Sequence, residues 1–111
     1  MKTTDQATAT AYESEEENVA HAEGRAVDLN EVNRVPIRFA TDLAAPRNKR
    51  EEVLERLRAL EASARANPEV ELFLSPIGGF ARDTATKQIV REATRQEMEA
   101  HRSHIHMTIM R

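Results

Sequence analysis

The chain of 111 residues contains no cysteine and no tryptophan, and its aromatic residues are three phenylalanines and one tyrosine. Without cysteine no disulfide can brace the fold, and with so few aromatics the core must be built from Val, Ile, Leu, Met and Ala. No stretch approaches the roughly 20 apolar residues of a membrane-spanning helix, and no apolar segment typical of a secretory signal follows the N-terminus. We therefore expect a soluble, cytoplasmic protein without a membrane partner.

Charge is divided unevenly along the chain. Residues 1–33 carry eight acids and two bases, a net of −6, whereas residues 34–111 carry eleven acids and fourteen bases, a net of +3, which together give the overall −3. The first segment has too few apolar residues to offset the entropy lost on ordering. We therefore predict a disordered acidic tail over residues 1–33 and one small body over residues 34–111. A short helix or a docked arm over residues 19–32 remains an alternative.

The spacing of apolar residues predicts two helices and three strands in the body. Apolar residues at helical spacing indicate a helix from Pro46 to Ala66, and a weaker stripe indicates a second from Thr84 to His101. Alternation of apolar and polar residues indicates strands at residues 34–39, 69–74 and 103–110.

The resulting order, β-α-β-α-β, favours an α/β fold in which right-handed crossovers join parallel strands. Strands buried on both faces read as continuous apolar runs, but these alternate. We therefore expect a three-stranded sheet with both helices on one face and the other face open to water or to a partner. An α+β sheet with mixed strand directions is the main alternative. On the open face the interface candidates are Phe73, His104, His106 and Met110.

Two histidines of the last predicted strand form a candidate metal pair. His104 and His106 stand at i and i+2, so on a strand their imidazoles share a face and can converge on one ion. His101 could supply a third nitrogen, and Glu69 or Glu71 a fourth ligand, as zinc requires. The segment that begins at His106 also resembles one copy of the His-x-Thr motif of two-histidine phosphoesterases. The simpler interpretation makes both histidines polar residues of a half-exposed strand, and no cofactor is predicted.

A group of basic residues forms a second candidate site, for nucleic acid. Such a surface could hold phosphates, although glutamates interleave with it and no aromatic residues offer base stacking. The residues are Arg34, Arg38, Arg47, Lys49 and Arg50.

No motif identifies a family, and no Ser-His-Asp arrangement can be placed. The leading hypothesis is a non-enzymatic interaction or assembly module that associates with itself or docks on a larger protein. The alternative is a nucleic-acid-binding accessory or regulatory protein. A third hypothesis is a small metal- or phosphate-handling enzyme centred on His104 and His106.

Overall fold

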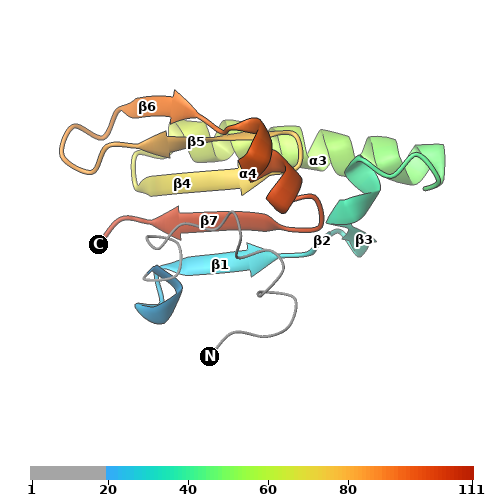
Figure 1. The fold of residues 1–111 in the computed structure, drawn as a ribbon, viewed down its shortest axis with the longest axis horizontal. Helices are drawn as coiled ribbons and strands as arrows, with labels where there is room; N and C mark the ends of the chain where they lie inside the picture. Colours follow the sequence, from blue (N-terminus) through green and yellow to red (C-terminus); the bar gives the residue numbers. More distant parts are fainter. Residues whose placement is uncertain (1–19) are drawn as a thin grey trace.

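The fold, given by a computed structural model that describes residues 20–111, is built on an antiparallel sheet with one long helix (Figure 1). Residues 20–22 are helical and precede the first strand. The elements that follow are β1 (Ala26–Leu29), β2 (Glu31–Val32), β3 (Val35–Pro36), the 3-10 helix η1 (Ile37–Ala40), α3 (Arg47–Ala66), β4 (Val70–Ser75), β5 (Gly78–Arg82), β6 (Ile89–Glu92), α4 (Arg95–Ala100) and β7 (Ile105–Ile109).

The main sheet has five strands in the order β1-β7-β4-β5-β6, and each neighbouring pair is antiparallel. The expected mixture of helix and strand is confirmed, but the three-stranded sheet and the parallel crossovers are wrong. The main reason is the turn after β4, where Ser75 pairs with Gly78. Only two residues lie between them, so the chain returns at once as β5 instead of crossing over through a helix.

The long helix was predicted correctly from its apolar spacing. Pro46 occupies the N-cap of α3, and Asn67 ends the helix in an extended conformation immediately before a proline. The buried face of α3 carries Val53, Leu57 and Ala64, which pack on the sheet.

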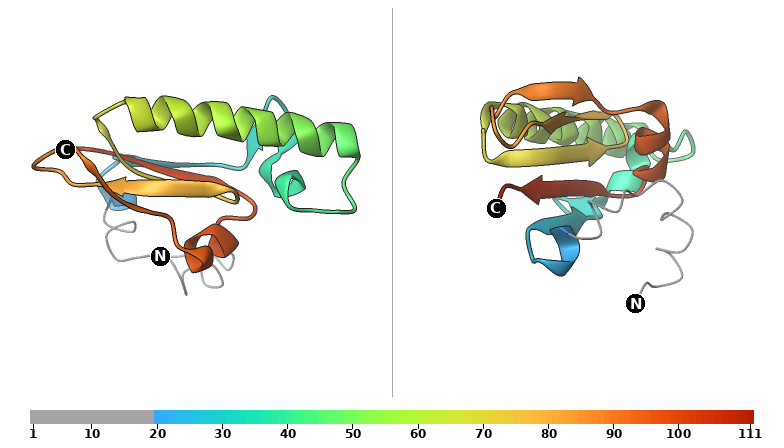
Figure 2. Two further views of the ribbon diagram at one scale, coloured as in Figure 1. Left: turned by 90° about the horizontal axis from the view of Figure 1, so that it is seen from above. Right: turned by 60° about the vertical axis from the view of Figure 1, so that its left-hand side comes forward.

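The predicted second helix from Thr84 to His101 is wrong. Within that segment Ile89–Glu92 form β6, the second strand of a hairpin with β5, and only Arg95–Ala100 are helical, as α4. Thr94 starts α4 with a capping box: its hydroxyl accepts the N–H of Glu97 at 3.1 Å, and the Glu97 carboxylate accepts the N–H of Thr94 at 2.8 Å. The two helices are not on one face either, because α3 and α4 lie on opposite sides of the sheet (Figure 2).

An irregularity in β4 changes which side chains after Val70 point into the core. The register between β4 and β7 shifts between Val70 and Leu72, so Val70 and Phe73 both enter the core beneath α3. Phe73 is 2% exposed and stacks on Phe80 with ring centroids 6.2 Å apart. The strict alternation that placed Phe73 on the open face is therefore wrong, because a bulge adds one residue to the period.

The folded part of the chain begins before the expected boundary at residue 33. Residues 26–29 form β1, which pairs with β7 as an edge strand of the main sheet. Conversely, the strand expected at residues 34–39 is reduced to the two residues of β3, after which the chain enters η1. The tail prediction for residues 1–19 falls outside the described residues.

Candidate functional site

All four histidines of the chain gather beside β7, with their rings in one series of contacts. His21 comes from the helical residues 20–22, His101 caps the C-terminal end of α4, and His106 lies within β7. Ring centroids are 4.9 Å apart for His21 and His106, 6.1 Å for His101 and His106, and 4.7 Å for His101 and His104. Segments far apart in sequence thus bring their imidazoles to one place.

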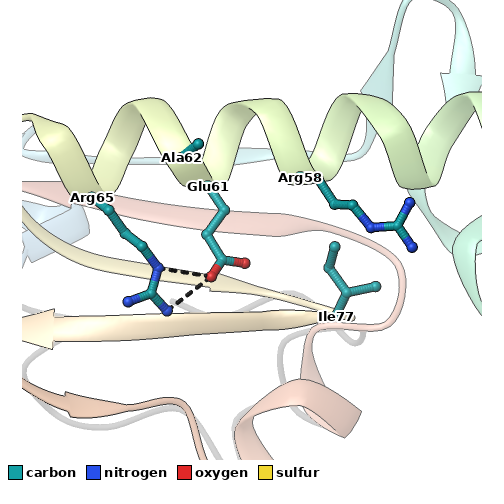
Figure 3. Close-up of a pocket in the computed structure, with 5 residues that line it drawn as sticks. All are labelled: Arg58, Glu61, Ala62, Arg65 and Ile77. Carbon is teal, nitrogen blue, oxygen red and sulfur yellow. Dashed lines mark hydrogen bonds and ion pairs between the residues drawn. The ribbon is translucent and has the colours of Figure 1, made fainter.

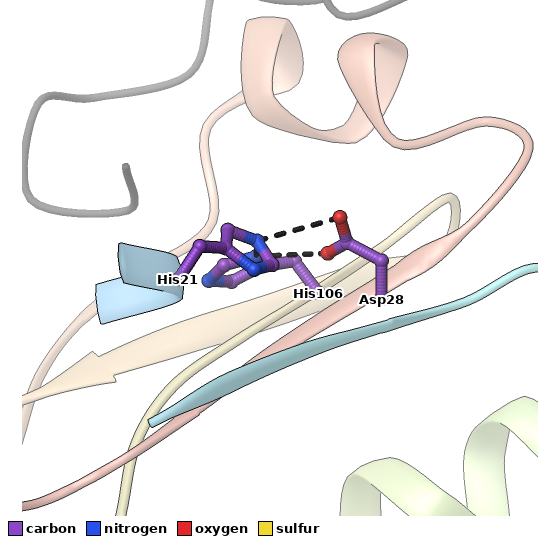
Figure 4. Close-up of side chains that lie close together, drawn as sticks. All are labelled: His21, Asp28 and His106. Carbon is purple, nitrogen blue, oxygen red and sulfur yellow. Dashed lines mark hydrogen bonds and ion pairs between the residues drawn. The ribbon is translucent and has the colours of Figure 1, made fainter. Parts of the chain in front are cut away.

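Asp28 and His106 are brought together by the pairing of β1 with β7. The two residues are register partners in that ladder, so their side chains leave the sheet on the same face. Asp28 Oδ1 lies 3.1 Å from His106 Nδ1, and Asp28 Oδ2 lies 3.4 Å from His21 Nε2. His21 Nε2 itself lies 3.2 Å from His106 Nδ1 (Figure 4). Three side chains therefore direct polar atoms at one another.

The three side chains differ in their exposure. The side chain of His106 is 1% exposed, whereas those of His21 and Asp28 are 32% and 39% exposed. The cluster is therefore buried at His106 and open to water at His21 and Asp28. Among residues 20–111 these three residues form a group that could hold a metal ion, each offering one ligand atom, with all three atoms within 4.8 Å of one another.

The other ring nitrogen of His106 faces the strand. His106 Nε2 lies 2.7 Å from the hydroxyl oxygen of Thr108, two residues along β7, and Thr108 is 3% exposed. His101 is held separately, because its Nδ1 donates to the carbonyl oxygen of Glu97 at 2.6 Å. The orientation of the His106 ring is thus fixed at both nitrogens.

The electrostatics of the cluster favour an ionised Asp28. Burial of the Asp28 carboxyl raises its pKa, but the hydrogen bond to His106 and the nearby imidazoles of His21, His106 and His104 together outweigh burial, so the pKa is lowered. A carboxylate with two imidazole nitrogens beside it can share a proton or bind a cation.

A second feature lies on the opposite face, where part of the sheet is not covered. Cross-strand pairing puts Val27, Met107 and Phe73 in one row on the α3 side. The helix α3 packs on β4 and β5, and its axis lies away from β1 at the other edge of the sheet (Figure 1). As a result Val27 is 48% exposed, Leu29 40% and Ile109 48%. We call these three residues the apolar strip.

The predicted interface residues do not share one open face. Phe73 and His106 are buried, and His104 and Met110 are half-buried. The apolar strip was missed because Val27 and Leu29 lie in the segment expected to be disordered. The same expectation concealed His21 and Asp28.

The metal set predicted from sequence is also only partly assembled. His106 belongs to the cluster, but His104 precedes β7 and is not one of the three grouped ligands. Glu69 pairs with Lys87 at 2.9 Å and Glu71 pairs with Arg25 at 3.3 Å. The two glutamates therefore serve other contacts.

The basic residues predicted to bind nucleic acid lie around the start of α3 and are partly compensated. Arg47 pairs with Glu51 at 3.1 Å and Arg38 with Asp42 at 3.7 Å. Arg50 donates to the backbone oxygen of Asp42 at 3.4 Å. The nucleic-acid hypothesis stays a prediction.

A shallow hollow of about 420 Å³ runs along α3 beside the β4–β5 turn (Figure 3). Arg65, one of its lining residues, donates hydrogen bonds to the carboxylates of Glu92 and Glu61. These hydrogen bonds raise the pKa of Arg65 by more than its partial burial lowers it. Because its guanidinium is already paired, Arg65 offers little attraction to an incoming anion. The residues that line the hollow are Arg58, Glu61, Ala62, Arg65 and Ile77.

Comparison with known proteins gives no relative: no family model, no curated protein and no solved structure matches the chain. Among residues 20–111, no helix combines the length and the apolar character needed to cross a bilayer. Function must therefore be argued from the geometry of the chain itself.

Proposed function

We propose that this protein is an assembly module that associates with a second copy of itself through the apolar strip on β1 and β7. The observation that carries the proposal is the exposure of Val27, Leu29 and Ile109, at 40–48%, on the face of the sheet where α3 stops. Contiguous exposed apolar surface on a small domain is characteristic of an interaction site.

The position of the strip at a sheet edge favours a second copy as its partner. β1 is the outermost strand on that side, and within residues 20–111 no other strand pairs with its free edge. A two-fold contact would bring two such edges and two strips together, each covering the other, as in the self-complementary interfaces of most dimers. It would also satisfy the unpaired backbone groups of the edge strand.

The test is the mass of the protein in solution, measured by sedimentation across a wide range of concentration. We expect a dimer for the natural chain and a weaker dimer for Val27→Asp. Burying a carboxylate twice in a symmetric contact should raise the dissociation constant by roughly tenfold or more.

The matched control is Val90→Asp, which makes the same substitution at a valine that is 64% exposed on the opposite edge strand, β6. Val90→Asp should leave the dimer intact. A natural chain that stays monomeric at the highest concentration, or a Val90→Asp variant that dissociates as readily as Val27→Asp, would contradict the proposal. Circular dichroism verifies that both variants are folded.

A further inference from the structure

We propose that His21, Asp28 and His106 form a binding site for a divalent transition metal of the zinc class. The site lies on the α4 side of the sheet, away from the apolar strip, and is therefore independent of the proposed self-association. It joins a ligand from the helical residues 20–22 to one from β1 and one from β7 (Figure 4).

The spacing of the ligand atoms is the first argument. Two ligands bound about 2.0–2.1 Å from a tetrahedral zinc ion stand about 3.3–3.4 Å apart. His21 Nε2 and His106 Nδ1 are 3.2 Å apart, and the two contacts from these atoms to the Asp28 carboxylate are 3.4 and 3.1 Å. The carboxylate directs one oxygen at each imidazole, so a small rotation of its plane would present either oxygen to the ion.

The second argument is the hydrogen-bonding capacity of the three groups. A carboxylate only accepts hydrogen bonds, and a neutral imidazole has one nitrogen that carries a lone pair. If His106 donates its Nε2–H to Thr108, its Nδ1 presents a lone pair toward Asp28 and His21. In this tautomer a metal ion can bind the Nδ1 lone pair and the carboxylate together, whereas in the metal-free chain the other tautomer donates its Nδ1–H to Asp28.

Thr108 contacts the ring nitrogen of His106 that faces away from the other two ligands. Ligating histidines usually donate their second ring N–H to an oxygen, which fixes the tautomer and the ring orientation. The 2.7 Å contact between His106 Nε2 and the buried Thr108 hydroxyl has this geometry. Thr108 is therefore a positioning residue rather than a ligand.

The donor set selects the class of metal. Two imidazole nitrogens and one carboxylate suit zinc and its neighbours among the transition metals, whereas magnesium and calcium prefer oxygen ligands alone. Three protein ligands leave a fourth position of a tetrahedral ion for water or another ligand. The partly exposed side chains of His21 and Asp28 give the ion a route from solvent.

In the experiment the full chain is titrated with zinc, and calorimetry measures the binding. A second titration uses cobalt, whose visible absorption reports tetrahedral coordination. We expect one ion per chain and a rise in melting temperature with zinc, because an ion that binds only the folded state stabilises it by mass action. His21→Gln and Asp28→Asn should each lower zinc affinity at least about tenfold, since even supporting residues cost that much in metal sites. Both residues are partly exposed, so their substitution leaves the core intact.

The control is His104→Gln, which removes the neighbouring histidine that sequence spacing alone would have paired with His106. It should change zinc affinity far less than His21→Gln does, because His104 supplies no ligand atom, and magnesium should not displace zinc from the natural chain. Absence of zinc binding, binding that survives both His21→Gln and Asp28→Asn, or binding lost equally in His104→Gln would each overturn the assignment. In the first case the cluster is a hydrogen-bonded network alone.

Discussion

His21 Nε2 lies 3.2 Å from His106 Nδ1 although 85 positions separate the two residues in the chain. The contact joins the start of the described chain to its last strand. It forms because β1 pairs with β7 and carries Asp28 directly opposite His106, which leaves the preceding helical residues above the same face. The contact therefore depends on the sheet order, and no local pattern in the sequence specifies it.

The first prediction concerns Thr108. Thr108→Val should lower zinc affinity about 10–100-fold, because it removes the oxygen that faces His106 Nε2 and leaves the imidazole tautomer unfixed. Thr108→Ser keeps the oxygen and should keep the affinity. Calorimetric titration of both variants measures the effect. Equal zinc affinity in the valine variant and the natural chain would show that Thr108 does not position His106.

The second prediction concerns Gly79 in the β4–β5 hairpin. A Cβ atom at this position would stand 2.0 Å from the backbone oxygen of Phe73, so the two strands must move apart to accept it. Gly79→Ala should lower the free energy of unfolding by about 3 kcal/mol or more, as overpacking against backbone does at its most severe. Urea denaturation measures the loss.

Gly24→Ala is the control for Gly79→Ala. Gly24 has φ +74°, a left-handed conformation, but its added Cβ would meet nothing within 4 Å. That change should cost roughly 1–2 kcal/mol from the backbone conformation alone. A Gly79→Ala variant no less stable than Gly24→Ala would contradict the steric argument.

The parts of the fold set by local pattern were predicted from the sequence. The helix α3 follows from its apolar spacing and from the prolines that flank it, and β4 and β7 follow from alternation. The sequence does not predict the hairpin β5–β6, because the weak apolar stripe after Thr84 indicates a helix instead. The Thr94-to-Glu97 capping box, which marks the true start of α4, was present in the sequence and could have corrected this.

The candidate sites were harder to predict, because they depend on sheet order and on one irregular register. The bulge between Val70 and Leu72 moves Phe73 from the expected open face into the core. The pairing of β1 with β7 turns part of an apparent acidic tail into an edge strand, and so provides Asp28 and the apolar strip. Neither feature leaves a periodic signal that a single sequence can show.

The third prediction concerns Arg82, a buried arginine that joins α3 to the hairpins. It is 9% exposed, and removing it takes a donor from four backbone carbonyl groups, two of which accept it in buried hydrogen bonds. Arg82→Met should therefore lower the free energy of unfolding by about 2–4 kcal/mol. The backbone oxygens that accept from its guanidinium belong to Ala64, Arg65, Val70 and Lys87.

Arg47→Met is the control for Arg82→Met, because Arg47 is exposed and forms a surface ion pair with Glu51. Its loss should cost no more than about 1 kcal/mol. Denaturant melts of both variants make the comparison. If Arg82→Met cost no more than Arg47→Met, the buried guanidinium would not be tying α3 to the sheet.

The last prediction concerns the contribution of the Glu97 carboxylate to stability at low pH. Burial raises the pKa of the Glu97 carboxyl. Hydrogen bonds from Arg91 and from the Thr94 backbone, together with the positive charge of Arg91, lower this pKa by more, so its net shift is downward. Because the folded pKa lies below the unfolded one, the unfolded state takes up the proton first as the solution is acidified. The contribution of ionised Glu97 is therefore complete above about pH 4.3, the ordinary glutamate value. It is lost as pH falls through the lower folded value.

Glu97→Gln isolates the charge, because glutamine still reaches back to the Thr94 N–H in a capping box but cannot ionise. The natural chain should be more stable than Glu97→Gln at neutral pH, and its melting temperature should fall more steeply on acidification until the two curves converge. Glu99→Gln, at an exposed acid of the same helix, should run parallel to the natural chain. Melting curves for Glu97→Gln that also stay parallel to those of the natural chain down to low pH would mean that the Glu97 carboxylate does not stabilise α4 through its charge.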